Sequence, residues 1–350
     1  VIVSASRTQE MALDAPASIS VLDAEEIEQT VSPSSVEGLR TVTGVDVAQT
    51  GVDRRELALR GFNNAFSGAT YVLTDYRQAA VPSLGVNIYS IMPNMSLDVE
   101  RVEVVRGPGS ALYGAGVDAG VIHFLTKNPF DHPGTTVSIT GGQRSMVAGQ
   151  LRHADVVGER FGYKLTGSYA EGTDWKLDPS DPVDRVQIEI DGRARNPDYQ
   201  RYNVNGMAQY RFAEDVQLTL NGGHSALTAA VLSGIGTVQG DGFGYSYGQV
   251  RFRAGDFFAQ GYLNKNDAGD SFVYGSGLSV VDKGELWAFQ TQYERDYWNG
   301  RQRFVVGGDA ELTRPKTEGE ILGRNEDDDD ITEVGGYLQS VTELSDQVEL

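Results

Sequence analysis

The segment from Val104 to Pro129, VVRGPGSALYGAGVDAGVIHFLTKNP, is rich in glycine and could cradle the phosphates of a nucleotide. A Walker loop carries a lysine directly after its second glycine, because that side chain must reach the phosphates. Gly109 and Gly114 have the required separation, but Ala115 occupies the lysine position. A dinucleotide-binding fingerprint needs a third glycine where this chain has Leu112. The glycines therefore do not indicate a nucleotide site, and another role must explain them.

The other reactive side chains form no catalytic pattern. The four histidines, His123, His132, His153 and His224, are scattered, and no Ser-His-Asp, Cys-His or HExxH arrangement accompanies them. The chain has no cysteine, which excludes thiolate catalysis and cysteine-bound zinc. We therefore predict a protein that is not an enzyme and that needs no cofactor and no resident metal.

The balance of charge argues against nucleic acid as a partner. Aspartate and glutamate number 49 against 29 lysines and arginines, which gives a net charge of −20, whereas nucleic-acid binding needs a basic patch. The strongest acidic run, Asn325–Asp330, could attract a cation or bind calcium. It lacks the glycine and the final glutamate of an EF-hand loop, so a solvated external loop is the simpler interpretation.

The sequence holds no apolar stretch of the length that a membrane-spanning helix needs. It opens on VIVSASR without a basic and apolar leader, and it ends on LSDQVEL while a strand pattern resumes. We expect a trimmed start and a truncated end.

Residues 1 to about 130 predict a small α+β unit. Asp23 with Glu26 forms a capping-box signal for a helix, and Ser34 with Glu37 predicts a second, short helix that Gly44 ends. Strands are predicted in the segments RRELALRGF, ATYVLTD and VERVEVVRG.

After Pro133 the pattern changes to long strands with one apolar and one polar face. In YNVNGMAQYRF, the residues Tyr202, Val204, Tyr210 and Phe212 alternate with polar residues. The predicted strands cover residues 134–142, 145–155, 161–170, 201–212, 216–225, 245–254, 257–266, 285–296, 302–312 and 332–343.

Short and long connections alternate between these strands after the first hairpin. The alternation places all short turns at one end of an up-and-down sheet, which is typical of a transmembrane β-barrel with periplasmic turns and extracellular loops. Trp175 and Trp298 fall at strand ends, where interfacial aromatic girdles lie. The alternative is a soluble all-β protein of repeated hairpins.

Several blocks of sequence resemble TonB-dependent outer-membrane receptors. VIVSASR resembles the end of the energy-coupling box, and DAPASISVLDAEEI resembles the first strand and helix of the plug domain. LRTVTGVDV, LALRGF and the long segment VERVEVVRGPGSALYGAGVDAGVIHFLTKNP resemble three further plug elements, and DDDITEVGGYLQSVTELSDQVEL resembles a barrel hairpin. The chain departs from the family pattern at Thr43, at His123, and at LTDY (Leu73 to Tyr76), where the family has proline, asparagine and L-I-D-G.

The resemblance implies a mainly β fold. A plug domain of residues 1–132 would precede the first ten or so antiparallel, up-and-down strands of a transmembrane β-barrel, residues 133–350. Plugged barrels of this kind have about 22 strands, so this chain would form an incomplete barrel and the natural protein would be longer.

The resemblance also implies roles for particular residues. Val1, Ile2, Val3, Ser4 and Ala5 would couple to TonB by strand addition, or would be only the first plug strand. Arg60 and Arg106 would form a latch with barrel glutamates, or simple structural ion pairs. The substrate would meet the plug apex loops, or these loops would be ordinary polar loops; the candidates are Gln49, Arg54, Arg55, Tyr76, Arg77, Asn87 and Tyr89. Turns and close packing would explain the plug signature Gly107, Pro108, Tyr113, Gly114 and Gly120.

The implied function is active transport across the outer membrane of a Gram-negative bacterium. The partners would be TonB, with ExbB and ExbD in the inner membrane, outer-membrane lipid, and a small-molecule metal chelate, for which a ferric siderophore is the leading hypothesis. Cobalamin, haem, nickel chelates and glycans stay open as substrates. A signalling or colicin-type receptor on the same scaffold and a soluble β-rich binding protein are the rival functions.

Overall fold

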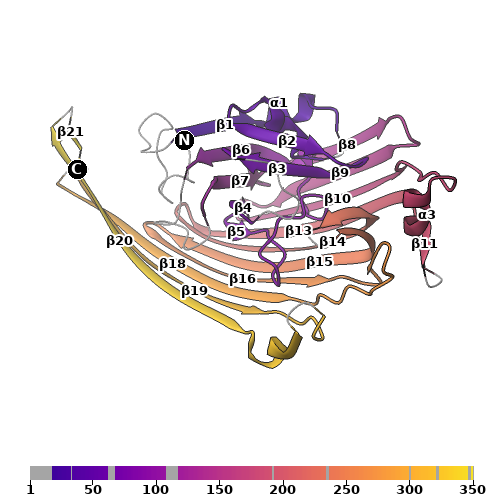
Figure 1. Ribbon diagram of the computed structural model, residues 1–350. Helices are drawn as coiled ribbons and strands as arrows, with labels where there is room; N and C mark the ends of the chain where they lie inside the picture. The colour runs from indigo at the N-terminus through magenta and orange to yellow at the C-terminus, as the bar shows by residue number, and fades with distance from the viewer. Residues whose placement is uncertain are drawn as a thin grey trace.

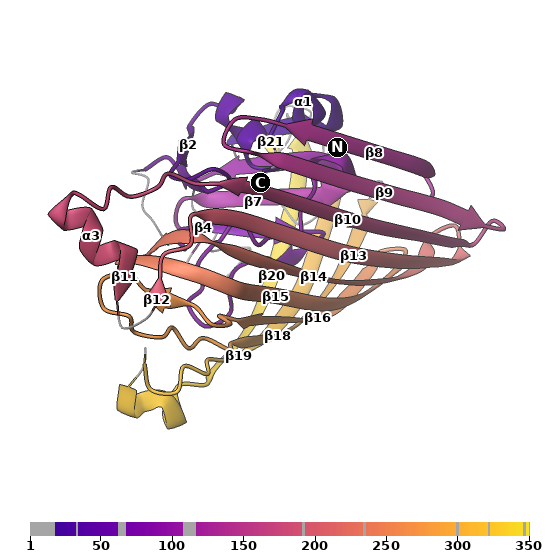
Figure 2. The ribbon, with the colours of Figure 1, turned by 90° about the vertical axis from the view of Figure 1, so that its right-hand side faces the viewer.

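The computed structural model describes residues 18–32, 34–61, 68–107, 117–190, 193–233, 236–298, 301–320, 323–345 and 348–349. An N-terminal unit, residues 18–126, lies against the concave face of a curved sheet that begins at residue 134 (Figures 1 and 2). We call that sheet the wall.

The N-terminal unit is built on a five-stranded sheet with the order β1-β6-β7-β4-β5, in which β4 and β7 pair in parallel. Its elements are β1 (Ser18–Asp23), α1 (Ala24–Gln29), η1 (Glu37–Thr41), β2 (Val45–Gln49), β3 (Arg55–Leu59), β4 (Thr70–Thr74), β5 (Arg77–Gln78), η2 (Ser96–Asp98), β6 (Val99–Arg106) and β7 (Gly120–Thr126). Strands β2 and β3 form a separate hairpin.

Of the two N-caps predicted for helices, one is confirmed and one is wrong. The capping box at Asp23 and Glu26 is confirmed, because each side chain accepts a hydrogen bond from the backbone of the other residue. The prediction for Ser34 is wrong: η1 is a 3-10 turn whose N-cap is Val36, without a side-chain cap bond. Ser34 contributes its carbonyl to the amide of Glu37 instead of its hydroxyl.

The core of the N-terminal unit lies between the central strands and the elements around them. Val99, Val102, Val104, Ile122 and Phe124 are almost completely buried. Because β6 and β7 are covered on both faces, they carry continuous apolar runs instead of an alternating pattern.

The wall consists of long antiparallel strands that follow one another in chain order. They are β8 (Gly134–Gly141), β9 (Val147–Val157), β10 (Phe161–Thr173), β13 (Asp198–Ala213), β14 (Val216–Ser233), β15 (Gly236–Ala254), β16 (Phe257–Asp267), β18 (Glu285–Tyr297), β19 (Gln302–Arg314) and β20 (Ile331–Ser345). Shorter elements are α3 (Pro182–Ile188), β11 (Glu189–Ile190), β12 (Arg193–Ala194), β17 (Phe272–Val273), η4 (Gly323–Asp328) and β21 (Val348–Glu349). Each predicted strand after Pro133 is confirmed.

One predicted long loop is wrong. Residues 226–244 continue β14 and β15 as a hairpin, with Ser233 opposite Gly236. The glycine-rich sequence hides the alternation, and a register shift between Leu227 and Ala229 breaks its period. The turns 158–160, 214–215 and 255–256 lie at the opposite end of the strands, which we call the short-turn end.

The two faces of the wall have opposite character. The outer face exposes apolar side chains, among them Leu165 (57% exposed), Val204 (60%) and Leu220 (46%). The inner face buries polar ones, such as Lys164, Gln209 and Gln260, against the N-terminal unit. Such a pattern is typical of a transmembrane barrel and the reverse of a β-sandwich. Among the helices in the described ranges, none has the length and hydropathy that crossing a membrane requires.

Candidate functional site at the interface of N-terminal unit and wall

A buried charge cluster joins the two parts near the short-turn end. Asp98, in η2, accepts from Arg152 Nε of β9 at 3.0 Å and from Lys164 Nζ of β10 at 2.8 Å. Lys164 also donates to the hydroxyl of Thr126 and to the carbonyl of Lys127, both at 2.9 Å. One carboxylate of the N-terminal unit thus holds two cations of the wall.

A second charge cluster lies toward the other end of the strands. Asp53 is buried between Arg201 of β13, whose Nη2 is 3.3 Å from Oδ2, and the hydroxyl of Tyr199, which donates to the same oxygen. In both clusters the carboxylate comes from the N-terminal unit and the cations come from the wall.

Side chains of the wall also form hydrogen bonds with the turn between β4 and β5, Asp75 and Tyr76, which we call the gripped turn. Asp75 and Tyr76 have φ values of +47° and +71°, a left-handed conformation that is unusual for a tyrosine. Gln249 and Arg251 both donate to the carbonyl of Asp75 at 2.9 Å, and Gln260 donates to the carbonyl of Tyr76 at 2.8 Å. Side chains of β15 and β16 therefore hold a strained turn in place.

Arg77 follows the turn and is completely buried in the wall. Its Nη1 donates to the hydroxyl of Tyr245 at 2.6 Å and to Asn264 Oδ1 at 2.9 Å. The guanidinium also lies 3.7 Å from the ring centroid of Tyr247, a close cation–π contact. Arg77 thus inserts a cation of the N-terminal unit into a polar and aromatic socket of the wall.

His123 supports the same turn from β7. Its Nε2 accepts a hydrogen bond from the amide of Tyr76 at 3.1 Å, and the two rings meet edge to face at 4.9 Å. Burial lowers the pKa of His123 from 6.5 to about 4, even though the carboxylates of Glu103 and Asp75 act in the opposite direction. The neutral imidazole is therefore the form that fits, because a protonated Nε2 cannot accept the bond.

This lowered pKa predicts that the N-terminal unit loses stability on acidification. Below pH 6.5 the unfolded chain binds a proton on this histidine that the folded chain refuses down to about pH 4. The free energy of unfolding should therefore fall by about 1.5 kcal/mol between pH 6.5 and pH 5. Hydrogen exchange of the β7 amides at several pH values measures it. His123→Gln keeps an acceptor without a titrating group and should remove this component; an unchanged pH profile in that variant would contradict the assignment.

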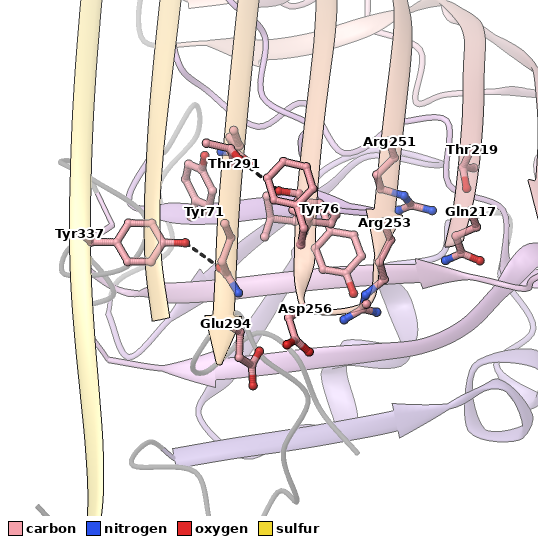
Figure 3. A pocket seen from close by; sticks show the side chains of 16 residues that line it. Tyr71, Tyr76, Gln217, Thr219, Arg251, Arg253, Asp256, Thr291, Glu294 and Tyr337 are labelled. Carbon is pink, nitrogen blue, oxygen red and sulfur yellow. Dashed lines mark hydrogen bonds between the residues drawn. The ribbon is translucent and has the colours of Figure 1, made fainter. Parts of the chain in front are cut away.

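A cavity of about 370 Å³ opens beside Tyr76, between β4 and the inner face of the wall. Strands β14, β15, β16, β18 and β20 and the turn at Gly255 and Asp256 contribute to its lining, which includes Phe258. Arg251, Arg253 and Tyr337 are among the lining side chains that Figure 3 labels. Within the described ranges, no cluster of three or more histidine, aspartate or glutamate side chains is arranged to hold a metal ion.

The predicted latch arginines do not reach the wall. Arg106 donates to the hydroxyls of Ser18 (3.1 Å) and Ser20 (2.8 Å) and to the carbonyl of Thr43 (3.0 Å), all within the N-terminal unit. Arg60 lies exposed at the end of β3, with φ at +46°. Among the described residues, the ion pairs across the interface have acids on the N-terminal unit and cations on the wall. The latch with barrel glutamates, which are expected in later strands, stays a prediction.

The predicted apex residues separate into two groups. Gln49 and Arg54 lie at the end of the wall away from the short turns, where Arg54 pairs with Glu56 at 3.1 Å and donates to the carbonyl of Leu232 at 3.1 Å. The prediction that Arg55 lies in an apex loop and meets substrate is wrong, because the side chain is buried and paired with Glu37.

The remaining apex candidates are turned inward. Tyr76 and Arg77 face the wall, Asn87 is buried and donates to the carbonyl of Thr70 at 2.8 Å, and Tyr89 (6% exposed) belongs to the apolar core. The prediction that they face the outside is therefore wrong in this structure, because each side chain is turned toward the plug core or the wall. Residues Val1, Ile2, Val3, Ser4, Ala5, Pro108, Tyr113 and Gly114 lie outside the described residues; Gly107 and Gly120 have φ values of +118° and +150°.

Sequence reasoning missed the residues that make most of the interface. Lys164, Gln249 and Gln260 each occupy an inward position of an alternating strand, so their direction could have been read from the period. Their partners could not, because those partners are distant in sequence and include backbone carbonyls.

The fold defines a class of protein in which a curved antiparallel wall with an apolar outer face holds a folded N-terminal unit on its inner face. Comparison with known proteins agrees with this class. Residues 12–121 match the model of the TonB-dependent receptor plug domain. The vitamin B12 transporter BtuB of Vibrio vulnificus (strain CMCP6) is 31% identical over 179 residues, which cover 49% of this chain and 28% of that protein. BtuB of Vibrio cholerae is 31% identical over 160 residues, 46% of this chain and 26% of that one.

Solved structures show the same fold at low sequence identity. The ferric enterobactin receptor PfeA of Pseudomonas aeruginosa superimposes with a TM-score of 0.68 at 15% identity, covering 96% of this chain and 56% of that one. The siderophore receptor PirA of the same species gives 0.62 at 17% identity, with 95% and 54% covered. The chain thus spans about half of these structures and about a quarter of the curated relatives. The N-terminal unit is therefore a plug domain of the TonB-dependent receptor type.

Proposed function

We propose that the protein imports a scarce nutrient chelate across the outer membrane of a Gram-negative bacterium, using energy that TonB delivers to the plug. The observation that carries the proposal is the interface itself: a folded plug is held to a barrel-type wall by buried ion clusters and a gripped turn. A pull on the plug would exchange these hydrogen bonds and ion pairs for water. It would also expose the apolar contacts that Val81, Val86 and Ile91 make with the wall.

The energy must come from a partner. TonB, with ExbB and ExbD in the inner membrane, would engage the extended N-terminus, for which Val1–Ala5 are our candidates, by adding a strand. Outer-membrane lipid would cover the exposed apolar side chains of the wall. Arg106 is held by hydrogen bonds inside the plug, and a latch role for Arg60 and Arg106 stays part of the proposal. Substrate arriving from outside would first meet Gln49 and Arg54.

A ferric siderophore is the substrate that we favour, and cobalamin is the second candidate. Solved neighbours that share the fold are named as siderophore receptors, and curated relatives at 31% identity are named as vitamin B12 transporters. Haem, nickel chelates and glycans stay open as alternative substrates of the proposed transporter.

The test uses the full-length gene in a deletion strain. Uptake of labelled iron from several siderophores and uptake of labelled cobalamin are measured with and without functional TonB. We expect uptake of one class to require both this gene and TonB. Uptake of every tested substrate at the level of the deletion strain would contradict transport, and uptake without TonB would contradict the energy source.

A further inference from the structure

The cavity beside Tyr76 lies at the opposite end of the plug–wall interface from Arg54. Its lining includes Gly255 and Asp256, which form the turn between β15 and β16, and Gln217, which follows the turn before β14. The cavity therefore opens at the short-turn end, whereas Arg54 contacts Leu232 near the tip of the β14–β15 hairpin. A ligand in this cavity would be separated from the outer loops by the gripped turn.

The charges of the cavity favour an anion. Arg251 and Arg253 come from the same strand and point to the same side of it (Figure 3). Each acid at the rim has a cation that is not part of the lining: Asp256 pairs with Arg295 at 3.1 Å, and Glu294 shares Arg303 with Asp296, at 3.3 and 3.0 Å. Within the described ranges Arg253 is exposed and its guanidinium makes no hydrogen bond or ion pair, so it is available to a ligand.

The walls of the cavity favour a planar group. Tyr76 and Phe258 lie with ring centroids 5.6 Å apart, and the Arg251 guanidinium is 5.3 Å from the Tyr76 centroid. Tyr71 and Tyr337 add two further rings from the plug and from β20. Gln217, Thr219 and Gln290 add amide and hydroxyl groups to the lining. Guanidinium groups among aromatic rings recognise a flat oxyanion by pairing with its oxygens and stacking on its face.

We propose that this cavity is a second ligand site, for an aromatic oxyanion of the phenolate or aryl-carboxylate class. Arg253 provides the charged anchor, and Tyr76 and Phe258 provide the stacking surface. The volume of about 370 Å³ accommodates one such ring with its substituents. That the site receives a chelate on its way to the periplasm rests on the proposed function; that it binds the aromatic oxyanion does not.

Tyr76 links the site to the grip on the plug. The Asp75 carbonyl accepts from Arg251, the same side chain that lines the cavity. An anion that draws Arg251 toward itself competes with that hydrogen bond, so an occupied site weakens one contact that holds the strained turn.

The binding experiment uses purified full-length protein in detergent with salicylate as the probe, followed by saturation-transfer NMR. Cyclohexanecarboxylate, which has the charge but no aromatic face, is the matched second probe. We expect salicylate to bind more tightly than cyclohexanecarboxylate, and Arg253→Gln and Arg253→Glu to weaken salicylate by about tenfold or more. Arg253→Lys should retain part of the affinity, because it keeps the charge and loses the planar fork.

The control variant is Arg160→Gln, an exposed arginine in the turn between β9 and β10 that is not part of the cavity. It should bind salicylate like the unaltered protein. Equal affinity in the Arg253 variants and the unaltered protein would overturn the site, and so would equal binding of both probes. Chelate uptake separates the two proposals: salicylate binding that depends on Arg253 in a protein that takes up no chelate supports the site and refutes the transport function.

Discussion

Asp98→Asn is expected to destabilise the plug by about 3–5 kcal/mol, because it removes the carboxylate that pairs directly with two buried cations of the wall. Arg152 and Lys164 are each about 95% buried and both pair with this carboxylate. An asparagine keeps the shape and one acceptor oxygen but removes the charge. The cost thus comes mainly from the two cations that remain, and much less from the lost hydrogen bonds.

Hydrogen exchange of the β6 and β7 amides in full-length protein measures this loss as a lower opening free energy. The matched control is Glu100→Gln, two residues away, which removes a half-exposed ion pair with Arg101 and should change stability by about 0.5 kcal/mol or less. The double variant Asp98→Asn with Lys164→Met should recover part of the loss, because one uncompensated cation is then absent. A single variant as stable as its Glu100→Gln control would show that the cluster is solvated.

The strands of the wall could be predicted because each carries its own period. Tyr202, Val204 and Tyr210 mark one face locally, and no distant contact is needed to assign them. The β14–β15 hairpin was missed where that local signal fails. The glycines of β15 interrupt the alternation of side chains, and the pairing across the two strands decides the structure.

The roles of the interface residues could not be predicted, since they depend on which surface each turn meets. The sequence Asp75-Tyr76-Arg77 is polar and is typical of an exposed turn. In the structure the turn faces the wall, where Gln249, Gln260 and Asn264 replace water as hydrogen-bond partners. Tyr89 was misplaced for a related reason: an aromatic residue in a polar loop suits either a ligand or a core, and packing of the plug selects the core.

Two residues at which the chain departs from the family pattern are in contact in the structure. Tyr76 stands where the family has glycine, and His123 stands where it has asparagine; the amide of the first donates to the ring of the second. A glycine would adopt the positive φ without strain. Tyr76 has this positive φ despite the strain, and its ring lines the cavity that we propose as the second ligand site.

Gly120→Ala is expected to prevent β6 and β7 from pairing at their shared end. Gly120 has φ at +150°, and a Cβ built there lies 2.2 Å from the carbonyl oxygen of Val105 and 3.0 Å from Leu59 Cδ1. The first contact is with backbone of the partner strand and cannot be relieved by a rotamer change. Strain in a region that glycine almost alone adopts, added to overpacking, costs about 3–5 kcal/mol.

The matched control is Gly149→Ala in β9, where a Cβ meets nothing within 4 Å and φ is not positive. Both variants are compared by the opening free energy of the β7 amides and by resistance of the plug to protease in the folded full-length protein. We expect Gly149→Ala to match the unaltered protein and Gly120→Ala to expose the plug. Because Gly120 lies in the glycine-rich segment that could have been a phosphate loop, the result also decides between two explanations of that segment. Loss of plug packing would support a geometric role for the glycine. An alanine variant with an intact plug would contradict that role.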